Sequence, residues 1–88
     1  MRIKTITVYA DPGHGWAKVS KKELIKLGIA SEISGFSYER GEFAFLEEDS
    51  DLSKYINALR SKNIPYKFKE HHTNRRSRIR EYFSYSGG

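Results

Sequence analysis

The stretch from Lys67 to Tyr82 contains the residue types best suited to binding an anion. An arginine guanidinium can pair with a phosphate or a carboxylate through two parallel hydrogen bonds, and aromatic rings can stack on nucleotide bases. The side chains assigned to this candidate binding segment are Lys67, Lys69, His71, His72, Arg75, Arg76, Arg78, Arg80 and Tyr82. We predict that they contact an anionic surface; the alternative is a solvated basic tail that only keeps the protein soluble.

The loop from Asp11 to Trp16 is a second candidate binding element. A proline and two glycines favour a tight loop, which would present the His14 imidazole, the Trp16 indole and backbone amides to a phosphate or a partner. The loop lacks the Gly-Lys-Ser/Thr ending of a Walker A motif and the third glycine of a dinucleotide fingerprint. Alternatively, it is a turn between strands whose tryptophan enters the core, leaving His14 exposed.

The acidic run contains Glu47, Glu48, Asp49 and Asp51. It lacks the spaced ligands, central glycine and distal glutamate of an EF-hand loop, so calcium binding is not indicated. At the start of a helix, carboxylates suit the helix dipole, and Asp49, Ser50 or Asp51 could cap the first turn. We therefore expect a mainly structural role, with an acidic docking patch for a basic partner as the alternative.

No catalytic constellation is recognisable in the sequence. His71 and His72 are adjacent, so on a strand they face opposite ways, and no carboxylate triad accompanies them. The three histidines match no zinc-binding spacing. We predict no catalytic residue, no metal site and no cofactor; the enzymatic alternative is a nuclease using His71 or His72 as its base.

Length and composition favour a single domain of 88 residues without cysteine, disulfides or thiolate chemistry. The absence of cysteine, of a signal peptide and of a long apolar run predicts a cytoplasmic protein without membrane contact. The net charge of +5 is unevenly placed, because residues 67–80 carry +5 whereas residues 39–51 carry −5. This asymmetry favours an oriented encounter with a charged partner.

The hydrophobic pattern predicts an α+β fold of the order β-β-α-β-β-α-β. Alternation indicates strands at residues 5–10 and 16–19, a hairpin of residues 36–38 and 43–45, and a strand at residues 64–69. Ser20 and Glu23 have the spacing of a capping box before a first helix that ends at Gly28. The clearest helix carries its apolar residues at helical spacing, namely Leu52, Tyr55, Ile56 and Leu59.

These elements predict a mainly antiparallel sheet of four or five strands with two helices on one face. The chain after His71 fits either a helix or a strand, because Ile79 and Phe83 are four residues apart and Ile79, Phe83 and Tyr85 also fit one strand face. The oligomeric state stays open. A homodimer could form through the hairpin edges that carry Phe36, Tyr38, Phe43 and Phe45.

Three short segments, Tyr9–Trp16, Phe36–Gly41 and Leu46–Asp49, resemble those of small uncharacterised accessory proteins of tailed phages and prophages. The similarity runs from Ile6 to Tyr85 and carries no catalytic residues over. It implies expression in the bacterial cytoplasm and action by binding a host factor, including components of defence systems. The basic net charge counts against a mimic of DNA.

We therefore expect a phage-encoded accessory protein that inhibits or redirects a host factor by direct binding. Its partner would present an anionic surface on a host protein or nucleoprotein. One alternative is a nucleic-acid-binding module that uses the basic C-terminal segment. Another is a sponge that sequesters a nucleotide signal, with Trp16 or Tyr82 stacking on a base.

Overall fold

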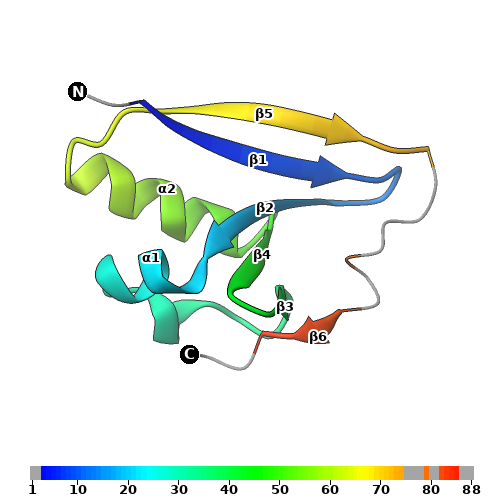
Figure 1. The fold of residues 1–88 in the computed structure, drawn as a ribbon, viewed down its shortest axis with the longest axis horizontal. Coiled ribbons are helices and arrows are strands. Elements are labelled where there is room, and N and C mark those ends of the chain that lie inside the picture. Colours follow the sequence, from blue (N-terminus) through cyan, green and yellow to red (C-terminus); the bar gives the residue numbers. More distant parts are fainter. Residues whose placement is uncertain (1–2, 75–78, 80–81, 86–88) are drawn as a thin grey trace.

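The computed structural model describes residues 3–74, 79 and 82–85, which form one α+β domain (Figure 1). The predicted order β-β-α-β-β-α-β is confirmed, with one further short strand at the C-terminal end. The elements are β1 (Lys4–Ala10), β2 (Gly15–Ser20), α1 (Lys21–Lys26), the 3-10 turn η1 (Ala30–Glu32), β3 (Tyr38–Arg40), β4 (Phe43–Glu47), α2 (Asp51–Ser61), β5 (Tyr66–His72) and β6 (Phe83–Ser84).

The sheet has six strands in the order β5-β1-β2-β4-β3-β6, so the prediction of four or five strands was too low. The sixth strand comes from the C-terminal segment that the sequence left ambiguous. Most neighbouring strands are antiparallel, as predicted, but β1 and β5 are parallel. Strand β5 reaches β1 through α2, and a helical crossover of this kind allows two strands to run in the same direction.

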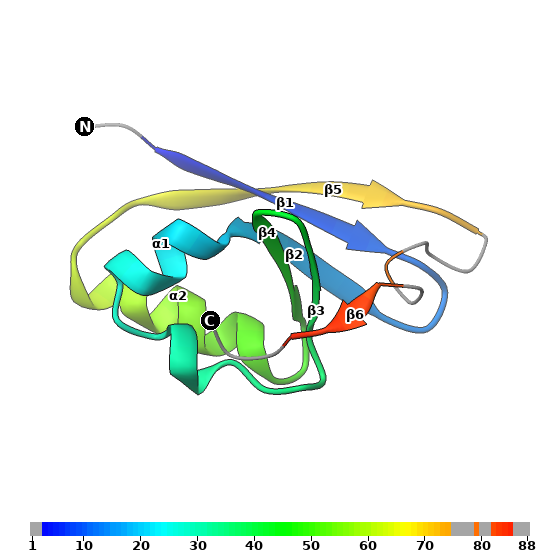
Figure 2. The same ribbon diagram turned by 60° about the horizontal axis from the view of Figure 1, so that its bottom comes forward.

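The main core lies between the sheet and the two helices. Ile6 and Val8 alternate with polar residues along β1, so they share the sheet face that meets Leu24 of α1 and Leu59 of α2. Figures 1 and 2 show both helices on this same side of β1 and β5. The prediction that the helices cover one face of the sheet is therefore confirmed.

A second, smaller core lies on the opposite face of the sheet. It consists of Trp16 from β2, Phe45 from β4 and Ile79 from the C-terminal segment, with three tyrosines packed around it. Only 2% of Trp16 is exposed, so the interpretation of residues 11–16 as a turn whose tryptophan enters the core is confirmed. Tyr85 then returns to the main core, where its hydroxyl donates to the carbonyl of Ala30.

The predicted capping box at the start of α1 is wrong. Ser20 precedes the helix, but its side chain makes no capping hydrogen bond. Glu23 instead forms an ion pair with Lys4 and accepts a hydrogen bond from the buried Tyr55 hydroxyl. These contacts replace the local cap because they give the Glu23 carboxylate both a charged donor, Lys4, and a buried donor, Tyr55. Gly28 ends the helix as predicted, with a φ of 76°.

The Tyr55 hydroxyl predicts a loss of stability in alkali. Burial, followed by the hydrogen bond and the negative charge of Glu23, raises the pKa of Tyr55 well above its usual value. A raised folded-state pKa means that stability is retained below the unfolded pKa, near 10, and decreases as the pH rises above it. We expect the stability of the native protein relative to Tyr55→Phe to fall by about 1 kcal/mol between about pH 10 and 11, measured by urea unfolding. If the free energies of unfolding of the two proteins changed equally with pH over this range, the prediction would be wrong.

Candidate functional site

Six residues of β1, β2 and β5 form a surface on the sheet face opposite the helices, which we call the basic face. Thr7 lies beside Lys69 on one side and Lys18 on the other, so these three side chains point to the same face. Lys67 and His71 alternate with Lys69 along β5 and share its direction. The members of the basic face are Thr5, Thr7, Lys18, Lys67, Lys69 and His71.

The spacing on the basic face follows from strand geometry. Lys67 and Lys69 start about 6.6 Å apart along β5, and Lys69 and Lys18 start about 10 Å apart across two strand spacings. The Lys18 ammonium lies 4.2 Å from the centre of the Phe43 ring, a cation-π contact that holds it over the sheet. The His71 ring stacks on Tyr9 with ring centres 5.3 Å apart.

The row that crosses the six strands through Thr7 contains no carboxylate among the residues that the structure describes. Its members, in sheet order, are Lys69, Thr7, Lys18, Phe45, Tyr38 and Ser84. The positive charge at the β5 end is therefore not neutralised within this row. Lys67, Lys69 and His71 are exposed and available to a partner.

The predicted arginine cluster of Arg75, Arg76, Arg78 and Arg80 lies outside the described residues, so its role stays a prediction. The described residues on either side are anchored: the amide of Thr73 donates to the carbonyl of Ala10, and Ile79 is buried in the second core. His71 and His72 face opposite sides of the sheet, as predicted, because they occupy consecutive positions of β5. Only His71 shares the basic face.

The aromatic residue Tyr82 lies at the border of the second core. Its ring packs 5.1 Å from that of Phe45, and the Arg40 guanidinium lies 5.2 Å from its centre. The Tyr82 hydroxyl accepts a hydrogen bond from Arg40 at 3.3 Å. The structure thus places Tyr82 on the same sheet face as the lysines, but over β4 and β3 rather than over β5.

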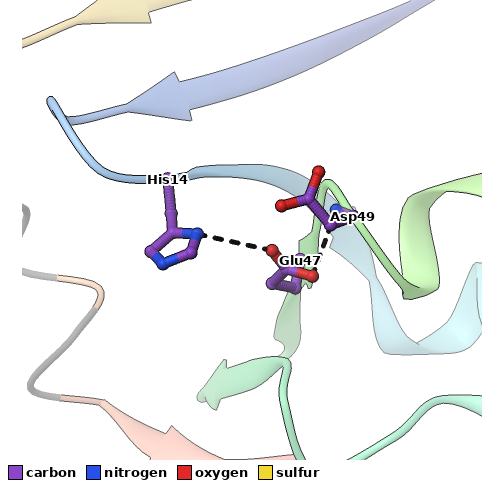
Figure 3. Close-up of side chains that lie close together, drawn as sticks. All are labelled: His14, Glu47 and Asp49. Carbon is purple, nitrogen blue, oxygen red and sulfur yellow. Dashed lines mark hydrogen bonds and ion pairs between the residues drawn. The ribbon is translucent and has the colours of Figure 1, made fainter.

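His14 and two carboxylates line a hollow of about 370 Å³ on this same face, near the start of β2 and the end of β4. His14 is exposed, as predicted, and its Nδ1 lies 3.6 Å from Oε1 of Glu47. Figure 3 shows these two side chains pointing toward each other, with Asp49 beside them. The remaining lining residues are Trp16, Phe36, Tyr38 and Ser50.

The acidic run does not form one patch, because its members have different environments. Glu47 is half-buried and faces the hollow, whereas Glu48 and Asp49 are exposed. Asp51 is completely buried, so its assignment to an acidic docking patch was wrong. The predicted side-chain cap of α2 is also not formed by Ser50, which precedes the helix. Ser50 donates instead to Glu47 at 2.9 Å.

The buried Asp51 carboxylate joins α2 to the segment before β3. It accepts hydrogen bonds from the amide and hydroxyl of Ser34, the hydroxyl of Ser37 and the ammonium of Lys54. Burial alone would raise the pKa of Asp51, but these donors together lower it below its usual value. The sequence analysis did not identify Ser34 or Ser37 as partners of Asp51. The signal for Ser37 was its place between Phe36 and Tyr38, at the alternating position that faces the core.

A second hollow, of about 440 Å³, lies on the helix side near the start of β1. Three lysines line it together with Leu27 and Ile64, namely Lys4, Lys26 and Lys62. Sequence reasoning missed this group because its lysines belong to β1, to α1 and to the turn after α2. Lys4 is already paired with Glu23, which reduces the positive charge there.

The hairpin edge that the sequence offered for dimerisation is occupied within the chain. Strand β3 pairs with β6 through Tyr38 and Glu39, so its outer edge is not available to a second copy. Strand β5 forms the opposite edge of the sheet. It carries lysines and histidines, which discourage edge-to-edge pairing.

No known family model, curated protein or solved structure matches this chain. In the part of the chain that the structure describes, no helix has the length and apolar character needed to cross a membrane.

Proposed function

We propose that this protein is an accessory protein of the bacterial cytoplasm that acts by binding an anionic partner on its basic face. We further propose that the partner is a nucleic acid, either alone or within a host nucleoprotein. The observation that supports this is the register that places Lys69, Thr7 and Lys18 side by side, with Lys67 one step along β5. Lys67 and Lys69 belong to β5 and Lys18 belongs to β2, and the sheet fixes the spacing of their backbones.

A nucleic-acid backbone fits this surface better than a small nucleotide does. The basic face is spread over three strands, and neither of the two hollows described above contains Lys18, Lys67 or Lys69. Lysines whose backbone positions lie about 6.6 to 10 Å apart can contact successive phosphates of a polymer, whereas a single nucleotide would engage only part of them. Lysine acts as a point charge toward phosphate, so we expect binding with little dependence on base sequence.

Salt dependence tests the proposal directly. The full chain without an affinity tag would be titrated into fluorescent single-stranded and duplex oligonucleotides, with binding followed by anisotropy. Three lysine contacts alone predict that the logarithm of the binding constant falls with the logarithm of salt concentration with a slope of about −2 to −3. An anisotropy that does not change at about 20 mM salt with any oligonucleotide would refute the proposal.

The resemblance-based hypothesis of a host protein factor, including a defence component, is a second candidate. The exposed Phe36, of which 76% is accessible, borders the hollow beside His14 and could contact a protein. Affinity purification from bacterial cells with and without nuclease treatment separates the two partner classes. A partner lost on nuclease treatment supports nucleic acid or nucleoprotein, whereas a nuclease-resistant partner supports a protein target.

A further inference from the structure

The hollow beside β4 brings together one imidazole from the β1–β2 turn and two carboxylates from the end of β4 and the segment after it. His14 belongs to the β1–β2 turn, Glu47 ends β4, and Asp49 lies between β4 and α2. One potential ligand atom from each of the three side chains lies within 4.8 Å of the other two. Sequence spacing did not predict this cluster, because the pairing of β2 with β4 is what places Glu47 near His14.

The distance between His14 and Glu47 is close to that between two ligands of one metal ion. At 3.6 Å, Nδ1 and Oε1 are too far apart for a hydrogen bond. Two ligands of a tetrahedral zinc ion, each about 2.0–2.1 Å from the metal, lie about 3.3 Å apart. The observed distance is therefore close to that of two ligands sharing one ion, and the potential ligand atoms of all three side chains lie within 4.8 Å of one another.

Neighbouring groups hold the Glu47 carboxylate and the turn that carries His14 in place. Oε2 of Glu47 accepts hydrogen bonds from the hydroxyl of Ser50 and the amide of Asp49, and Oε1 is the atom that faces His14. Oδ1 of Asp11 accepts from the amides of Gly13 and His14, both at 2.9 Å, which fixes the turn that carries the imidazole. Such supporting hydrogen bonds typically orient the ligands of metal sites.

We propose that His14, Glu47 and Asp49 bind a divalent first-row transition-metal ion of the zinc class. An imidazole with two carboxylates suits such ions, whereas calcium and magnesium prefer sites made only of oxygen ligands. Three protein ligands leave a fourth position for water or for an anionic group of a partner. The hollow of about 370 Å³ gives that position access from solvent. This inference does not depend on the proposed nucleic-acid function.

The test uses the full chain without a histidine tag and Zn²⁺ or Co²⁺ as the probe. We expect Zn²⁺ to bind with one ion per chain in calorimetry, and Co²⁺ to acquire the strong visible absorption of a low-symmetry, four-coordinate ion. The variants His14→Ala, Glu47→Gln and Asp49→Asn should each weaken Zn²⁺ binding, His14→Ala by more than about 100-fold. Circular dichroism would verify that each variant is folded.

Two control variants distinguish ligation from general attraction of cations. Glu48→Gln removes the carboxylate between Glu47 and Asp49 without touching the cluster, and His72→Ala removes an exposed histidine on β5. Both should bind Zn²⁺ within about twofold of the native protein, since neither is a ligand. Equal affinity of His14→Ala and native protein, or a Co²⁺ spectrum identical to that of the free aqueous ion, would overturn the proposal.

Discussion

Replacing Asp51 by asparagine is expected to lower the free energy of unfolding by about 3 kcal/mol. The native carboxylate is fully buried and receives donors from Ser34, Ser37 and Lys54. An asparagine amide has one acceptor oxygen and would turn its NH₂ group toward at least one of these donors. A domain of this size has a total stability of about 4–13 kcal/mol, so the loss would be a large part of it.

The expected cost is high because Ser37 connects this carboxylate to other elements. Its hydroxyl donates to Asp51 and accepts from the amide of Glu47, and its carbonyl accepts from the amide of Tyr85. Loosening Asp51 thus weakens contacts of α2, β4 and the C-terminal segment together. Urea unfolding measures the change, with Asp49→Asn in metal-free buffer as an isosteric control expected to stay within about 0.5 kcal/mol. Similar effects of the two variants would contradict the assigned role.

The same carboxylate predicts part of the acid sensitivity of the protein. Because hydrogen bonds lower the folded-state pKa of Asp51 despite its burial, the unfolded chain binds this proton more readily. The stabilisation is therefore complete above the unfolded pKa, near 4, and is lost as the pH falls through the lower folded-state value. The stability difference between native protein and Asp51→Asn should shrink below about pH 4. A difference that stays constant down to about pH 2 would contradict this assignment.

Removing the three lysines of the basic face should abolish most of its nucleic-acid affinity. In the variant Lys18→Gln/Lys67→Gln/Lys69→Gln, the loss of three phosphate contacts predicts an approximately 100-fold weaker binding constant at about 0.1 M salt. A plot of the logarithm of the binding constant against the logarithm of the salt concentration should have a slope smaller in magnitude by about 2 to 3. Lys67 and Lys69 are exposed, so these two substitutions should change stability little.

A matched variant on the other side of the molecule separates this site from overall charge. Lys22, Lys26 and Lys62 are exposed residues of α1 and of the end of α2, and replacing them by glutamine removes the same net charge. We expect this control to retain its nucleic-acid affinity within about threefold, because salt at about 0.1 M screens charges far from the binding surface. Equal losses in the two triple variants would indicate general charge attraction and contradict a basic face.

Most elements of the fold can be predicted from local periodicity and turn residues in the chain. The spacing of Leu52, Tyr55, Ile56 and Leu59 requires a helix with one apolar face, and alternation at Ile6 and Val8 requires a strand. Proline and glycines before Trp16 define a turn that leaves His14 exposed. These features involve neighbours in the chain, whose geometry is set by backbone sterics alone.

Which side chains come into contact depends on how the strands and helices pair in three dimensions. The pairing of β1 with β5 and with β2 brings Lys69 and Lys18 to one face, and the pairing of β2 with β4 brings Glu47 to His14. Burial likewise separated Asp51 from the exposed Glu48 and Asp49, and Glu23 contacted Tyr55 instead of capping its own helix. Such choices depend on strand register and on competition for buried donors. Strand register and competition for buried donors both involve residues far apart in the chain, so local sequence patterns cannot predict them.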